Sequence, residues 1–189
     1  MKIELLEAAT PYIRYWDTAV DGGAYKGEWT YPLSTKFKTV YAFEPQKVYA
    51  EMLEITHVPN VIVVNAALMD QPGMGIFVVP PRDPRKPATD RSTTVLRGRG
   101  AVKIVRLDDY PISNCALIKL NVEGCEHLVL EGARHILEND GPVIIMEEAH
   151  PKKLPDPYKK SSRQSRRFLG TMGYVLAGEY GHDSIWRRK

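Results

Sequence analysis

Four short runs of apolar, mostly β-branched residues recur along the chain. They occupy residues 39–43, 61–64, 116–120 and 143–146. Each run is shorter than a typical helix and is apolar without alternation, a pattern that favours strands covered on both faces, as in a parallel sheet. We therefore predict that these segments are strands in the interior of the protein.

Helical patterns lie between these runs. Residues 125–138 carry an apolar stripe at the i, i+3, i+4, i+7 spacing of an amphipathic helix, and an Asp-Gly-Pro sequence at 140–142 closes it. A second helix is expected after Glu44, with Pro45 at its first position. Strand and helix thus alternate, which is the signature of a doubly wound, mostly parallel α/β sheet with right-handed crossovers.

Two regions break this alternation. Residues 73–79 and 101–107 are expected to pair as a hairpin around a loop rich in proline, arginine and glycine. Residues 173–180 and 183–187 predict an antiparallel hairpin at the C-terminal end of the sheet. The segment before them predicts a loop that leads into a helix ending near Met172.

Composition predicts an ordinary globular protein. A length of 189 residues suits a single domain, 1–189, and the 43% hydrophobic and 26% charged contents are typical. No stretch approaches the roughly 18 apolar residues of a membrane span, and the first residues do not resemble a secretory signal. Cys115 and Cys125 flank one predicted strand, too far apart for a disulfide. These features predict a cytoplasmic protein with free thiols and no membrane partner.

Positive charge is concentrated in two blocks. Residues 81–106 hold eight basic and two acidic side chains, and residues 151–167 hold seven basic and one acidic, so each block carries +6. If the two blocks converge in space, they form a positive rim that attracts an anionic substrate. Arg97 and Arg99 are then expected to help hold that substrate. The alternative is two solvated surfaces.

Polar residues follow the expected strands at the points where they end. Asp21, Gly22 and Gly23 follow a first strand that ends near Val20, and Glu44 lies about twenty residues further on, at the end of the second. Open parallel sheets bind ligands at this edge, and an acid at the second strand suits ribose hydroxyls. A tight turn and a helix cap are the purely structural roles for the same residues.

The spacing fits two cofactor classes, nicotinamide dinucleotides and S-adenosylmethionine. A pyrophosphate binds at glycines and a helix N-terminus, where the carboxylate of Asp21 would repel it. S-adenosylmethionine has no phosphate, and its ammonium and sulfonium groups would be attracted by that carboxylate. The terminal hairpin is also typical of the methyltransferase version of this sheet. S-adenosylmethionine is therefore the predicted cofactor.

A series of short motifs continues from about residue 17 to residue 175. The motifs are Asp21-Gly22-Gly23-Ala24, Ala42-Phe43-Glu44-Pro45, Asn65-Ala66-Ala67, Arg106-Leu107-Asp108-Asp109, Ile118-Lys119-Leu120-Asn121-Val122-Glu123-Gly124-Cys125-Glu126, Leu130-Glu131-Gly132-Ala133, Pro142-Val143-Ile144-Ile145-Met146-Glu147 and Gly173-Tyr174. Together they resemble the FkbM-like S-adenosylmethionine-dependent methyltransferases. The resemblance implies a class I methyltransferase (Rossmann-like) fold and O-methylation of a hydroxyl on a sugar, polyketide or similar small metabolite.

The resemblance also implies a set of cofactor-binding residues. Their expected partners are the methionine portion for Asp21, Gly22, Gly23 and Ala24, the ribose for Glu44 with Pro45, and the adenine for Asn65 and Ala66. Asn121 belongs to the same set, but the family pattern usually shows aspartate there. Asparagine keeps a hydrogen-bonding side chain and loses the charge, which argues against a role as an anionic ligand. It also opens the alternative of a non-catalytic binding protein that retains the fold.

Methyl transfer to an alcohol requires a base for the hydroxyl proton. The candidates beyond the strand ends are Glu123, Glu147, Glu148 and His150, of which His150 and Glu147 are favoured because they follow the last parallel strand. Hydrogen bonding to a neighbouring loop is the structural alternative for each.

Two further patterns suggest a metal site and a nucleic-acid site, and each has a simpler structural explanation. His127, Glu131 and His135 share one face of the predicted helix, but they lie along a line too long to close on one ion, so no metal is predicted. Aromatic residues near the N-terminus, with the arginine-rich loop, could bind single-stranded nucleic acid. No nucleic-acid fold motif accompanies them, so a nucleic-acid methyltransferase is kept as an alternative only.

Overall fold

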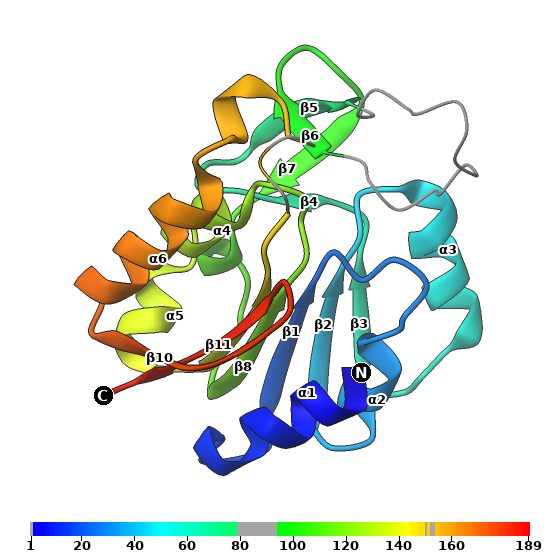
Figure 1. The fold of residues 1–189 in the computed structure, drawn as a ribbon. Helices are drawn as coiled ribbons and strands as arrows, with labels where there is room; N and C mark the ends of the chain where they lie inside the picture. The colour runs from blue at the N-terminus through cyan, green and yellow to red at the C-terminus, as the bar shows by residue number, and fades with distance from the viewer. Residues whose placement is uncertain (1, 79–93, 150, 152–153) are drawn as a thin grey trace.

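A seven-stranded sheet, parallel except at one end, forms the centre of the protein (Figure 1). The structure, a computed structural model, describes residues 2–78, 94–149, 151 and 154–189. The strand order is β10-β11-β9-β8-β1-β2-β3, with β11 antiparallel to both of its neighbours. The strands are β1 (Thr18–Gly22), β2 (Thr39–Phe43), β3 (Val61–Val64), β8 (Cys115–Leu120), β9 (Val143–Glu147), β10 (Tyr174–Tyr180) and β11 (Asp183–Arg188). The predicted parallel sheet with its C-terminal antiparallel hairpin is confirmed.

Helices cover both faces of this sheet (Figure 1). One face carries α1 (Lys2–Ala9), α2 (Thr30–Ser34) and α3 (Lys47–Thr56), and the other carries α4 (Glu126–Glu131), α5 (Arg134–Asn139) and α6 (Ser161–Thr171). Short 3₁₀ turns are η1 (Thr10–Tyr12), η2 (Leu107–Asp109) and η4 (Asp156–Tyr158). Each face has its own core, and the consecutive residues Leu117 and Ile118 of β8 are buried in different ones. The run that forms β8 lacks alternation because both of its faces are covered, whereas β3, at the edge of the sheet, leaves Ile62 exposed.

A second, smaller sheet lies above the carboxyl ends of the large sheet's strands (Figure 1). It contains β4 (Ala67–Leu68), β5 (Gly73–Val78), β6 (Thr94–Arg97) and β7 (Val102–Val105), in the order β4-β7-β5-β6. The predicted antiparallel pairing of β5 with β7 is confirmed, but the two strands do not form a hairpin, because β6 lies between them along the chain. Strand β6 was not predicted and pairs with the other edge of β5.

The structure corrects two helix predictions. The single helix expected over 125–138 is wrong, because the chain breaks into α4 and α5 around Gly132. The carbonyl of Met69 packs against this glycine, and a Cβ there would lie 2.2 Å from the carbonyl oxygen. Pro45 does not begin the next helix either, since Gln46 is extended and α3 begins at Lys47.

The structure also tests the predictions of free thiols and of no membrane-spanning helix. Cys115 and Cys125 are buried free thiols, as predicted. Burial raises the pKa of both, so they act as packing groups rather than nucleophiles. Within the described ranges, no helix is long and apolar enough to cross a membrane.

Candidate functional site

The carboxyl ends of β1, β2, β8 and β9 open into a cavity of about 580 Å³. Of the predicted site residues, its wall contains Gly23, Ala24, Glu44, Pro45, Ala66, Asn121, Glu123 and Glu147. Asp21, Gly22 and Asn65 lie outside this wall, and His150 lies outside the residues that the structure describes. Parallel strands thus bring together side chains that are distant in the sequence.

Glu44, at the end of β2, is held by the backbone on both of its carboxylate oxygens. Oε2 accepts the N–H of Tyr25 at 2.7 Å, and Oε1 accepts that of Gln46 at 2.8 Å. Burial raises the pKa of Glu44, and these two hydrogen bonds oppose that effect. Each oxygen keeps a further lone pair, so the fixed carboxylate can accept hydroxyl hydrogens from a ligand in the cavity.

Asp21 is occupied by an ion pair beneath the turn that follows β1. Its Oδ1 lies 2.9 Å from Nζ of Lys119 on the neighbouring strand β8, and its Oδ2 accepts the hydroxyl of Thr30 at 2.7 Å. The Asp21 side chain is fully buried, and only 4% of the Lys119 side chain is exposed. The expected contact between this carboxylate and a cationic cofactor is therefore not supported, because Lys119 already neutralises the charge.

The turn after β1 needs glycine because two strand ends meet there. Gly23 has a φ of +78°, and a Cβ on it would lie 2.0 Å from the carbonyl oxygen of Asn121. The N–H groups of Gly23 and Ala24 both donate to the carbonyl of Phe43 at 3.0 Å. Contacts within the protein thus explain the glycine, while the turn itself forms part of the cavity wall.

Asn65 ties the loop after β3 to the loop after β2. Its Nδ2 donates to the carbonyl oxygens of Glu44 at 2.9 Å and Pro45 at 3.1 Å. The side chain therefore positions the residues on either side of it, and Ala66, not Asn65, faces the cavity.

Asn121 and Glu147 meet at the ends of β8 and β9. The Nδ2 group of Asn121 donates to Oε2 of Glu147 at 2.7 Å. Leu120 and Met146, the residues before them, are register partners in the two parallel strands. The pair therefore lies at the carboxyl ends of two paired strands.

The other candidate bases have different surroundings. Glu148 is paired with Arg166 at 2.8 Å and accepts hydrogen bonds from Ser162 and Ser184, which commits its carboxylate to the packing of α6 and β11. Glu123 adopts a φ of +52°, and its carbonyl accepts the hydroxyl of Thr94 at 2.8 Å. Of the two, only Glu123 keeps its candidacy as a base, although its backbone has a structural function as well.

A buried network supports the loop between β8 and α4. Glu126 accepts the N–H groups of Val122 at 3.3 Å and Gly124 at 3.1 Å, together with the hydroxyl of Ser161 at 3.1 Å. Burial raises the pKa of Glu126. Ser161 also lies 3.1 Å from Nδ1 of His127, whose pKa burial lowers. His127 thus belongs to a buried hydrogen-bonded network. The described residues contain no group of three or more side chains suited to a metal.

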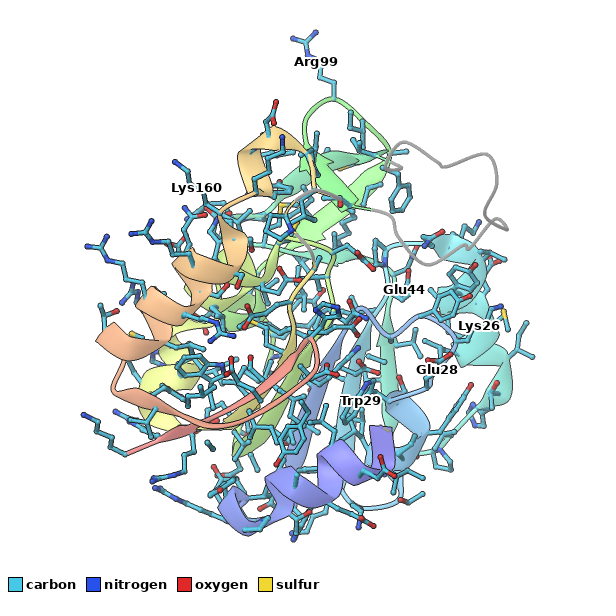
Figure 2. The ribbon with its side chains drawn as sticks, in the orientation of Figure 1. Lys26, Glu28, Trp29, Glu44, Arg99 and Lys160 are labelled. Atoms are coloured by element: carbon cyan, nitrogen blue, oxygen red, sulfur yellow. The ribbon has the colours of Figure 1, made fainter. Side chains whose placement is uncertain are left out.

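Carboxylates outnumber cations along the cavity wall. Its acidic members are Glu28, Glu44, Glu123, Glu147, Glu148 and Asp183, and Lys119 is its one lysine or arginine among the described residues. Arg97 of the basic block pairs with Asp70 at 2.8 Å. Figure 2 shows Arg99 and Lys160 projecting outward, away from Glu44, Glu28 and Trp29. The described part of the predicted basic rim therefore does not line the cavity.

Sequence analysis missed several residues of this wall. Tyr25 and Trp29, from the segment between β1 and α2, and Tyr180 and His182, from the β10–β11 turn, all line it. Lys119 had a signal in the sequence, because a lysine inside an apolar strand needs a buried partner. The aromatic residues lie in segments without periodicity and gave no such signal.

These features define the class of the protein. A sheet with this strand order, helices on both faces and a cavity at the strand ends is that of the class I S-adenosylmethionine-dependent methyltransferases. The chain belongs to the FkbM methyltransferase family, since the family model described as "Methyltransferase FkbM domain" matches residues 21–176. A comparison with curated proteins finds no match.

Solved structures share the fold at low sequence identity. Methyltransferase FkbM from Methylobacillus flagellatus KT has a TM-score of 0.60 and 17% identity, covering 90% of this chain and 43% of that one. A candidate methyltransferase from Streptococcus mutans, solved in complex with SAH, has a TM-score of 0.57 and 15% identity, covering 98% and 96%. An rRNA methylase from Streptococcus thermophilus has a TM-score of 0.56 and 14% identity, covering 100% and 96%. This chain spans less than half of the Methylobacillus protein.

The cavity wall fits S-adenosylmethionine, the methyl donor of this class. Glu44 supplies fixed acceptor oxygens of the kind that a ribose diol requires. Ala66, Ala67 and Leu68 offer apolar surface for an adenine ring. The carboxylates of Glu44 and Glu147 in this wall suit the ammonium and sulfonium charges of the cofactor.

Proposed function

We propose that this chain methylates a hydroxyl group of a small metabolite or sugar, with Glu147 as the general base. The carrying observation is the carboxylate of Glu147, which ends β9 in the cavity wall and is held on one oxygen by Asn121. S-adenosylmethionine, when bound, supplies a methyl group on a sulfonium that is open to in-line attack. The protein's task is then to hold the acceptor oxygen close to that methyl and to take its proton.

We assign the wall residues to a cofactor site and an acceptor site. Gly23 and Ala24 would hold the methionine portion of the cofactor, Glu44 with Pro45 the ribose, and Ala66 the adenine. Asp21, Gly22 and Asn65 act indirectly, because they fix the β1 turn and the loop after β3. Trp29, Glu147 and the β10–β11 turn, which line the same cavity, are the proposed acceptor site.

Glu147 is preferred over the other candidate bases for its surroundings. Its Oε2 accepts one hydrogen bond, and no group in the part of the chain that the structure describes donates to Oε1 and competes there with a hydroxyl proton. Glu123 is the second choice from the same wall. His150 lies outside the residues that the structure describes, so its role as a base stays a prediction from the sequence.

An uncharged acceptor is favoured over an anionic one. The carboxylates of Glu44 and Glu147 in the wall would repel an anion, and Lys119 is neutralised by Asp21. Arg97, expected to bind an anion, is instead paired with Asp70.

The proposal is tested by methyl transfer from labelled S-adenosylmethionine to a panel of neutral sugars, phenols and their phosphorylated forms. We expect a base-stable methyl ether on an uncharged hydroxyl compound. Glu147→Gln should lower kcat by about 10²–10⁴-fold, while Glu138→Gln, on the surface of α5, should not. Binding of the cofactor with no transfer to any compound would favour the non-catalytic alternative.

A nucleic-acid acceptor is the second candidate, favoured by the outer face of α6. Lys160, Arg163 and Arg167 are exposed there, and none forms an ion pair with another described residue. The rRNA methylase from Streptococcus thermophilus has the same fold. A steep fall in oligonucleotide affinity with salt, abolished by Arg163→Glu/Arg167→Glu, would support this candidate over a small acceptor.

A further inference from the structure

The contact between Asn121 and Glu147 is one that an ionised carboxylate at position 121 could not make. Nδ2 donates to Oε2 at 2.7 Å, and an amide can donate whereas a carboxylate only accepts. Two carboxylates at this spacing would repel each other and share a proton. The amide therefore leaves Glu147 as the one carboxylate of this pair, while Asp183, its register partner on β11, and Glu148 also line the cavity.

Three neighbouring strands fix the pair. The backbone N–H of Asn121 donates to the carbonyl of Gly22, at the end of β1, at 2.9 Å. Leu120 and Met146, which precede the two side chains, are fully buried and in register. The hydrogen bond thus forms between two rigid positions, which restricts the rotation of the Glu147 side chain.

The pair also makes the two oxygens of Glu147 unequal. Asn121 occupies one lone pair of Oε2, so Oε1 is the oxygen that keeps both of its lone pairs for a ligand. Among the described residues, Asn121 is the one side chain that hydrogen-bonds to Glu147. Removing the amide would therefore free the carboxylate to rotate without displacing any other partner.

We infer that Asn121 is a positioning residue for Glu147 rather than a ligand of the cofactor. It holds Oε2 and keeps Glu147 the only carboxylate of the pair, ready to accept a proton from the acceptor hydroxyl through Oε1. Oε1 would take the hydroxyl proton while the methyl group passes from the donor's sulfur to the acceptor oxygen, and the electron pair of the broken sulfur–methyl bond would stay on sulfur. This inference rests on the proposed role of Glu147 as the base.

The test compares Asn121→Ala, the isosteric Asn121→Asp and the exchanged pair Asn121→Asp/Glu147→Gln, with Asn139→Asp on the exposed end of α5 as a matched control. We expect Asn121→Ala to lower kcat at least tenfold while the Kd for S-adenosylhomocysteine stays within about threefold. Asn121→Asp should move the acidic limb of the pH–rate profile upward by about one unit or more. The exchanged pair restores an amide–carboxylate contact, so it should recover thermal stability but not kcat.

The opposite results overturn the inference. A large loss of S-adenosylhomocysteine affinity in Asn121→Ala, with kcat unchanged, would make Asn121 a cofactor ligand. An unchanged kcat in Asn121→Ala, together with a lower melting temperature, would make the contact merely structural. If Asn121→Ala does not fold, an unmoved pH profile in Asn121→Asp overturns it equally. Failure of the proposed function itself has a different signature, namely full turnover by Glu147→Gln.

Discussion

Replacing Lys119 by methionine tests how the β1 turn is held in place. In the native protein, Nζ lies 2.9 Å from Oδ1 of Asp21 and also donates to the carbonyls of Gly23 at 3.0 Å and Gly22 at 3.4 Å. Methionine would leave the Asp21 carboxylate, which is fully inaccessible to solvent, with the hydroxyl of Thr30 as its remaining partner. Breaking a buried pair in this way costs about 3–5 kcal/mol.

Urea unfolding at neutral pH measures this loss. With an m-value of about 2 kcal/mol/M, the midpoint should fall by roughly 2 M. The double variant Asp21→Leu/Lys119→Met removes both charges and should recover most of the loss, because neither group is then left unpaired. A loss below about 1 kcal/mol in Lys119→Met would refute the reasoning, since it is the size expected of a solvated surface pair.

Three further predictions follow from the described contacts. Gly23→Ala should destabilise the fold by about 2–5 kcal/mol, because alanine is strained in the left-handed conformation and its Cβ would clash with Asn121. Gly98→Ala, which has open space around it, is the control and should change the melting temperature little. Equal melting temperatures for the two variants would contradict this prediction. Burial raises the pKa of Glu126 in the folded protein, so the unfolded chain releases this proton at a lower pH than the folded protein does. The free energy of unfolding of the wild type should therefore fall, relative to that of Glu126→Gln, as pH rises above the ordinary carboxyl range. A difference in urea unfolding that does not change with pH would count against this prediction. Arg99→Ala should leave kcat/KM and its salt dependence unchanged because Arg99 projects away from Glu44 and the cavity (Figure 2), and a marked loss with an anionic acceptor would restore the basic-rim hypothesis.

The large sheet could be predicted because its strands carry a local signal. Runs such as 116–120 are apolar on both faces, and their ends place Glu44 and Glu147 at one edge whatever the details of packing. The break at Gly132 could not be found in this way. It depends on the carbonyl of Met69, which a periodic pattern within residues 125–138 does not reveal.

The ion pair of Asp21 could not be predicted for a similar reason. The sequence places a carboxylate at the right edge of the sheet, but its charge is cancelled by Lys119, which is 98 positions away. The contact between Asn121 and Glu147 is also non-local, yet it follows once β8 and β9 are taken as adjacent parallel strands. Strand adjacency is therefore the information that turns separate motifs into a site.

Calorimetric titration with S-adenosylhomocysteine tests the central claim most directly. The wild type should bind one equivalent, and Glu44→Gln should bind about 10–100-fold more weakly, because it loses a charge-assisted acceptor for the ribose. Glu51→Gln, on the solvent-facing side of α3, is the matched control and should bind as the wild type does. Absence of heat with S-adenosylhomocysteine, together with binding of NADH, would contradict the assignment of this cavity to a methyltransferase cofactor.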